Sequence, residues 1–105
     1  MKAISAFFTE RNSKLTVMCE HQGSLRIVHH LITKEEADKA DRIQLSIKGR
    51  FGLQSTLVVT KEELNAALRQ NEMDYVEWKA LNEAGQEMKS WSDWATDRLK
   101  MRIII

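Results

Sequence analysis

The 105-residue sequence contains no proline, only four glycines and a single cysteine. Because glycine and proline are the strongest breaks in a chain, we expect each glycine, at positions 23, 49, 52 and 85, to mark a turn. Cys19 has no second cysteine to pair with, which excludes an internal disulfide and favours a reducing compartment, so we expect a cytoplasmic protein. No apolar run approaches the roughly 20 residues that a membrane-spanning helix needs.

An excess of one charge sign is also lacking, since 16 basic and 15 acidic residues leave a net charge of +1. The chain as a whole therefore has no field that would attract a polyanion such as DNA, and a nucleic-acid role would need a local basic patch. Hydrophobic residues make up 43% and charged residues 30%, which is typical of globular proteins. A chain of this length suits one core, so we expect a single globular domain over residues 1–105.

The first sixty residues alternate between apolar and polar side chains as β-strands do. Residues 3–8 predict a first strand, and residues 15–20 and 25–31 predict a hairpin around Gly23. Assuming a three-residue loop in this hairpin, we expect Cys19 opposite Ile27 and Val17 opposite His29 on one apolar face. Residues 42–48 and 53–59 predict a second hairpin around the GRFG turn.

Two segments carry a helix start signal, a threonine followed three residues later by glutamate. Thr33 with Glu36 predicts a short helix to about residue 40, and Thr60 with Glu63 predicts a second helix. From residue 71 onward the apolar residues recur with a helical period, and Gly85 separates two groups. The expected core faces are Met73, Val76, Ala80 and Ala84 in one helix and Met88, Trp91, Ala95 and Leu99 in the next.

Strands followed by helices indicate an α+β fold. We predict an antiparallel sheet of about five strands, formed by the N-terminal strand and two hairpins, and covered on one face by C-terminal helices.

The sequence closes on Ile103, Ile104 and Ile105. β-Branched side chains favour extended backbone over a fraying helix end, so we expect a short strand here. Such a strand covers a sheet edge in its own chain, or it pairs with a second copy to give a homodimer. The sequence leaves both alternatives open.

Four residues of the first hairpin belong to types that bind metals or act in catalysis: Cys19, His21, His29 and His30. In the expected pairing they spread along the hairpin, and one cysteine lacks the paired spacing of structural zinc sites. Cys19 alternates with leucine and valine on an apolar face, where a thiol is unreactive. The sequence also has no phosphate-binding loop or nucleophile elbow. We therefore expect neither a metal or cofactor site nor an enzyme activity.

A second candidate surface is the GRFG turn, which places Lys48, Arg50 and Phe51 at a hairpin tip, with Arg26 on the other hairpin. Two cations and a stacking ring are suited to a phosphate backbone with unpaired bases. A solvated turn explains the same residues, because glycine serves the turn and charge keeps it soluble.

The C-terminal helices are rich in tryptophan. By helical spacing Trp91 lies on the predicted core face, while Trp94 lies about 60° from its centre and Trp78 lies off its own helix's apolar line. These rings either widen the core or remain partly exposed beside Arg98 and Arg102, which we place on the polar side of the last helix. Exposed tryptophan beside arginine is a common composition of binding hot spots.

We therefore expect a small non-catalytic protein-binding module. It would act as an adaptor or as an inhibitor of a larger machine, including a nucleic-acid-processing one, of the kind that phages and mobile elements carry. The expected contact residues are Trp78, Trp91, Trp94, Arg98 and Arg102. The alternative is a nucleic-acid-binding regulator that uses Arg26, Lys48, Arg50 and Phe51.

Overall fold

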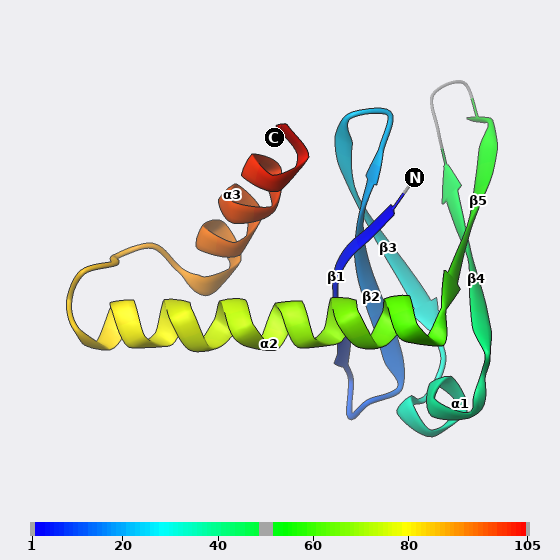
Figure 1. The fold of residues 1–105 in the computed structure, drawn as a ribbon, viewed down its shortest axis with the longest axis horizontal. Coiled ribbons are helices and arrows are strands. Elements are labelled where there is room, and N and C mark those ends of the chain that lie inside the picture. The colour runs from blue at the N-terminus through cyan, green and yellow to red at the C-terminus, as the bar shows by residue number, and fades with distance from the viewer. Residues whose placement is uncertain (1, 49–51, 105) are drawn as a thin grey trace.

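The computed structural model describes residues 2–48 and 52–104 and shows an α+β fold with two antiparallel sheets (Figure 1). One sheet has three strands in the order β1 (Lys2–Thr9), β2 (Lys14–His21), β3 (Ser24–Leu31), and the other pairs β4 (Arg42–Lys48) with β5 (Gln54–Thr60). The helices are α1 (Lys34–Lys39), α2 (Lys61–Glu83) and α3 (Trp91–Ile104). The expectation of one sheet of about five strands is therefore wrong, although the strands and their antiparallel pairing are confirmed.

The strands form two sheets because each hairpin has an apolar face that needs a cover. Packing the hairpins face to face buries both faces, which continuing one sheet edge to edge would not do. On β2 the inward side chains are Leu15, Val17 and Cys19, all fully buried. On β4 and β5 the inward side chains are those of Ile43, Leu45, Ile47, Leu57 and Val59.

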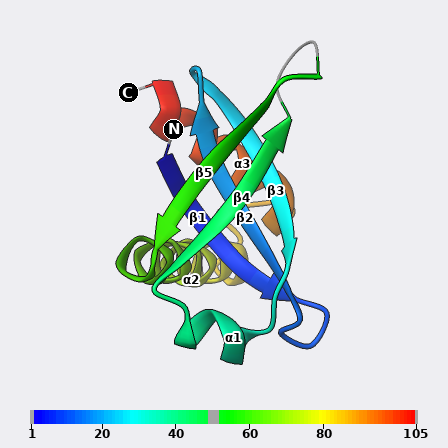
Figure 2. The same ribbon diagram turned by 90° about the vertical axis from the view of Figure 1, so that its right-hand side faces the viewer.

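The helices close this sandwich in two places. α2 crosses the free edge at β1 at a large angle to the strands and contributes Leu64 and Ala67 to the core (Figure 2). α3 lies against the face of the three-stranded sheet that β4 and β5 do not cover, and it buries Trp94 and Leu99 (Figure 1). The three-stranded sheet is therefore a middle layer, with a two-stranded sheet on one side and a single helix on the other.

The β2–β3 hairpin has a tighter turn than the sequence predicts. Its loop has two residues, Gln22 and Gly23, with φ of +53° and +76°, the positive values that a type I′ turn requires. Cys19 consequently pairs with Arg26 instead of Ile27. A shift of one residue reverses the two faces of a strand, so the predicted apolar face of β3 is wrong. Arg26, Val28 and His30 share the face of the core residues of β2, and Ile27 is exposed.

This turn offers a stability test. Asparagine tolerates positive φ better than glutamine, and asparagine followed by glycine is the preferred type I′ pair. We expect Gln22→Asn to raise the free energy of unfolding by about 0.5–1 kcal/mol, a gain of the size that compatible turn substitutions give. Urea denaturation of both proteins measures the difference. Destabilisation by Gln22→Asn would contradict the two-residue turn and the register that it sets.

Both helix start signals are confirmed. Thr33 Oγ1 accepts a hydrogen bond from the Glu36 backbone N at 3.1 Å, and Thr60 Oγ1 accepts one from the Glu63 backbone N at 3.2 Å. The two helical patterns on either side of residue 71 belong to one helix, α2, of 23 residues. Gly85 follows this helix with φ of +73°, as the left-handed residue of a Schellman-type end does.

The strand expected at the C-terminal isoleucines is wrong for Ile103 and Ile104, which continue α3. Ile105 lies outside the described residues. The local preference of isoleucine for extended backbone costs only a few tenths of a kcal/mol per residue, and the packing of α3 outweighs it. Ile103 is half-buried at the mouth of a groove described below.

Candidate partner-binding surface at the junction of α2 and α3

The second half of α2 extends beyond the two sheets, and α3 folds back from its far end toward them (Figure 1). A helix of 23 residues is about 34 Å long, which is more than these short strands can cover. Leu64 and Ala67 of the first half are in the core, whereas Met73, Val76 and Ala80 of the second half are exposed. The predicted core face of this segment is therefore wrong, and the helix meets α3 with a different face.

The connection between α2 and α3 is held by local hydrogen bonds. Trp78 Nε1 donates to the Lys89 carbonyl oxygen at 3.0 Å, and Asn82 Nδ2 donates to the Glu87 carbonyl oxygen at 3.0 Å. Ser90 begins α3, because its Oγ accepts from the Asp93 backbone N at 3.2 Å. These bonds fix the loop at both ends and set the angle at which α3 returns.

Four aromatic residues fill the junction: Tyr75, Trp78, Trp91 and Trp94. We call them the aromatic cluster. The ring centroid of Trp91 lies 5.2 Å from that of Tyr75, in an edge-to-face contact, 6.0 Å from that of Trp78 and 6.1 Å from that of Trp94. Tyr75 and Trp78 are 5.9 Å apart. Distances and tilts of this kind are favourable for aromatic pairs, so the four rings stabilise one another.

Burial across the aromatic cluster is graded. Trp94 is 7% exposed, Trp78 and Trp91 are half-buried, and Tyr75 is 42% exposed. Helical spacing predicts the opposite order for Trp91 and Trp94, and that prediction is wrong. The reason is the projection of α2: Trp91, one turn earlier in α3, packs against Tyr75 and Trp78 in the second half of α2, which extends beyond the sheets. The cluster thus has a buried end at Trp94 and an open end at Tyr75.

Two ion pairs join α3 to α2. Arg102 donates from Nη1 and Nη2 to the two carboxylate oxygens of Asp74, each at 2.7 Å, and Asp74 is buried. Gln70 Nε2 adds a third donor to this carboxylate at 3.1 Å. The hydrogen bonds to Asp74 raise the pKa of Arg102 above its ordinary value. A bidentate pair with a buried carboxylate holds one relative position of the two helices.

Arg98 is also engaged within the chain. Its Nη2 donates to Glu77 Oε1 at 2.9 Å, and its guanidinium carbon lies 4.6 Å from the centre of the Trp94 ring. Such a cation–π contact contributes about 1–2 kcal/mol when the ring is buried. Arg98 and Arg102 therefore face α2, and our placement of them on the outer polar side of α3 is wrong. Asp74, Tyr75 and Glu77 were not predicted as site residues; the signal available was their spacing around Trp78 on the same helix.

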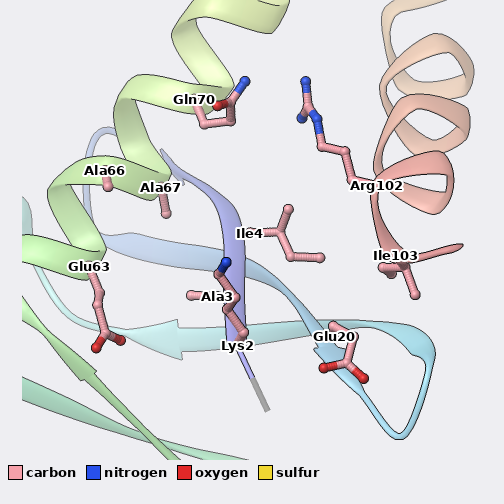
Figure 3. Close-up of a pocket in the computed structure, with 10 residues that line it drawn as sticks. All are labelled: Lys2, Ala3, Ile4, Glu20, Glu63, Ala66, Ala67, Gln70, Arg102 and Ile103. Carbon is pink, nitrogen blue, oxygen red and sulfur yellow. The ribbon is translucent and has the colours of Figure 1, made fainter. Parts of the chain in front are cut away.

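A groove of about 870 Å³ lies beside this junction, between the first half of α2, the end of α3 and the start of β1 (Figure 3). Its apolar lining includes Ile4, Ala67 and Ile103. Figure 3 shows Gln70 from α2 and Arg102 from α3 approaching the same point above Ile4, which is where Asp74 binds both. At this end of the groove Gln70 and Arg102 are thus already engaged by internal hydrogen bonds.

A second, shallower groove of about 580 Å³ lies between β3 and β4. Arg26 and Lys48, two of the predicted nucleic-acid contacts, line this groove together. Arg26 Nε is buried and, among the described residues, has no hydrogen-bond partner. Arg50 and Phe51, the other two, lie outside the described residues.

Of the residues considered for metal binding or catalysis, His30 shares the sheet face of Cys19, and His29 is separated from Cys19 by the sheet. Cys19 faces the core, and burial raises the pKa of its thiol. His29 lies on the opposite face, where its Nδ1 is 2.9 Å from Thr16 Oγ1. Within residues 2–48 and 52–104, no three His, Cys, Asp or Glu side chains lie close enough to share a metal ion.

Across the described ranges, the helices are too short or too polar to cross a lipid bilayer. No protein-family model, no curated protein and no solved structure matches this chain.

Proposed function

We propose that this protein is a small cytoplasmic protein-binding module, without catalytic activity, that binds its partner through the open end of the aromatic cluster. The observation that supports this proposal is the exposure of Tyr75, at 42%, in contact with two half-buried tryptophans. Met88, in the loop before α3, is 89% exposed and adds apolar area to the same junction. Exposed aromatic and methionine side chains are enriched in protein interfaces.

The rigidity of this surface also supports protein binding. The ion pairs Asp74–Arg102 and Glu77–Arg98, with the Trp78 hydrogen bond, hold the rings in place before any partner arrives. Binding through preordered side chains avoids the cost of about 0.5–1.5 kcal/mol for each side chain that must otherwise be immobilised. This surface suits an adaptor, or an inhibitor that covers a functional surface of a larger machine.

In this proposal the predicted contact residues divide into two groups. Trp78 and Trp91 contact the partner with their exposed edges, together with Tyr75. Trp94, Arg98 and Arg102 act indirectly, because they position the rings and are themselves buried or paired.

The nucleic-acid alternative has one observation in its favour, the shared groove of Arg26 and Lys48. Phosphate contacts lose affinity steeply as salt rises, whereas contacts between aromatic rings and a protein partner do not. Gel shifts with duplex and single-stranded DNA and RNA at low salt test it. Binding that Arg26→Ala and Lys48→Ala weaken would favour the alternative, and no binding at low salt removes it.

Tyr75→Ser combined with Met88→Ser tests the partner surface. Tyr75 loses its ring contacts with Trp78 and Trp91, so we expect the melting temperature to fall by about 5–10 °C while the protein stays folded, which far-UV circular dichroism checks. Loss of a hot spot costs 2 kcal/mol or more, so partner capture from an extract of the source cells should fall at least ~30-fold.

Val58→Ser is the matched control, because Val58 is 41% exposed on β5, away from the junction. It should capture the same proteins as wild type. Equal capture by the double variant and by Val58→Ser would exclude the open end of the aromatic cluster as the binding surface.

A further inference from the structure

The outer face of α2 has a regular pattern that the fold does not use. Seven exposed residues recur every three or four positions along it: Arg69, Glu72, Met73, Val76, Lys79, Ala80 and Glu83. Apolar side chains occupy the middle of this stripe and charged side chains occupy its ends and margins. Spacing of this kind is typical of a helix that packs against another helix.

In the described part of the chain no other element covers this stripe. Val76 is 67% exposed and Met73 is 64% exposed. Figure 2, which views α2 end-on, shows both sheets and α1 on one side of the helix and none of them on the other. None of the four charged residues of the stripe forms an ion pair within residues 2–48 and 52–104.

We propose that this stripe binds the same stripe of a second copy of the chain, as an antiparallel helix pair with its two-fold axis beside Val76. In such a pair each residue lies close to residues of the second copy that are about as far from Val76 on the other side and on the same margin of the stripe. Because the interface is isologous, each contact occurs twice.

The charges of the stripe favour this arrangement. Arg69 lies opposite Glu83 of the partner subunit, seven residues on either side of the axis. Glu72 and Lys79, four before and three after Val76, come close to each other across the same axis. Four pairs of opposite charge therefore flank the contact, and they specify its register.

The apolar side chains also fit together. Val76 meets Val76 of the partner subunit at the axis, and Met73 lies beside the partner's Ala80. A large side chain opposite a small one lets two helices approach closely without leaving a void.

A parallel pair in register is unfavourable for the same stripe. It would place Arg69 against Arg69 of the partner subunit and Glu83 against the partner's Glu83. Like charges across a helix interface are repulsive and select against that orientation.

The interface is small. The stripe from residue 69 to residue 83 is about 22 Å long, and one helix pair of this length buries less than the ~1,200 Å² of a standard interface. We expect a reversible dimer with a dissociation constant on the order of 10 µM. The stripe includes none of Tyr75, Trp78 and Trp91, so the dimer does not use the rings of the proposed partner surface.

Disulfide trapping tests the pairing and its direction with single cysteine replacements at exposed positions. Under mild oxidation at about 50 µM, Val76→Cys should crosslink to itself. Arg69→Cys alone and Glu83→Cys alone should not, but a mixture of the two should give the crosslinked dimer. The wild-type chain, whose only cysteine is the buried Cys19, and Gln44→Cys on the exposed side of β4 set the background. Crosslinking of Arg69→Cys to itself would contradict the antiparallel direction. If Val76→Cys and the mixture crosslink no more than the two background proteins, the helix pair itself is contradicted.

Sedimentation velocity over 5–200 µM supplies a second readout, with the range chosen to bracket the expected ~10 µM dissociation constant. Arg69→Glu should raise this constant at least ~10-fold by placing like charges opposite each other, and adding Glu83→Arg should restore it. A monomer at every concentration, or no rescue by the double charge reversal, would overturn the proposal. Capture of a protein partner through Tyr75 is a separate measurement and does not depend on this result.

Discussion

Trp94→Ala is expected to lower the free energy of unfolding by about 3–4 kcal/mol, within the range for large aromatic side chains removed from a core. Trp94 is 7% exposed, and its removal eliminates the contact with Trp91 and the cation–π contact with Arg98. The space that it leaves lies between α3 and the sheet, where neighbouring side chains cannot close it without moving the helix. Urea denaturation followed by far-UV circular dichroism measures the loss.

Trp91→Ala is the matched control for this prediction. Trp91 is the same residue type, one turn earlier on α3, but it is half-buried and packs on Tyr75 and Trp78 of α2. We expect Trp91→Ala to lower the free energy of unfolding by about half as much as Trp94→Ala, because folding removes roughly half of the Trp91 side-chain area from water. A larger loss for Trp91→Ala than for Trp94→Ala would mean that α3 docks with the face that its apolar spacing predicts.

Asp74→Ala should lower the free energy of unfolding by about 2 kcal/mol. Breaking a fully buried ion pair costs about 3–5 kcal/mol. The loss is smaller here because the Arg102 side chain is 29% exposed, so its guanidinium is partly hydrated when the carboxylate is removed. The variant removes both acceptors of the Arg102 guanidinium and the acceptor of Gln70. Urea denaturation of both proteins gives the difference, and α3 should lose its docking first.

Glu77→Ala removes the neighbouring ion pair, with Arg98, and serves as the control. Both partners of that pair are partly exposed, so its loss should cost at most about 1 kcal/mol. If the two variants were equally stable, the bidentate pair would not be what holds α3 on α2. Arg102→Lys should be intermediate, because it keeps the charge but loses the paired geometry.

Local patterns were sufficient to predict the strands of the β4–β5 hairpin and the starts of α1 and α2. In β4 only one face is apolar, the face with Ile43, Leu45 and Ile47. Each threonine cap accepts a hydrogen bond from the backbone N–H three residues later. Such features depend on neighbours in the sequence, so the sequence alone contains the evidence for them.

The register of the β2–β3 hairpin and the division into two sheets were not predictable in this way. Alternation favours the face of β3 that carries Leu25, Ile27 and Leu31, but the two-residue turn at Gln22 and Gly23 directs the opposite face toward the core. Whether two hairpins join edge to edge or pack face to face depends on how the segment with α1 crosses between them.

In the candidate site, the sequence indicated which aromatic residues matter but not how deeply each is buried. Helical spacing assumes that a helix packs along its whole length, and α2 projects beyond the sheets. The projecting half meets α3 with the face of Asp74 and Glu77, which leaves Met73 and Val76 exposed, turns Arg98 and Arg102 toward α2, and buries Trp94 in place of Trp91. These are consequences of tertiary geometry that no local period contains.

The central claim is that the open end of the aromatic cluster contacts another protein. The most direct test places a photoreactive benzoylphenylalanine at position 75 in living cells and compares its crosslinks with those from position 44 on β4. We predict a discrete protein adduct from position 75, of the same mass as the partner lost by Tyr75→Ser with Met88→Ser, and none from position 44. Identical patterns from the two positions, or no adduct from position 75, would contradict the claim.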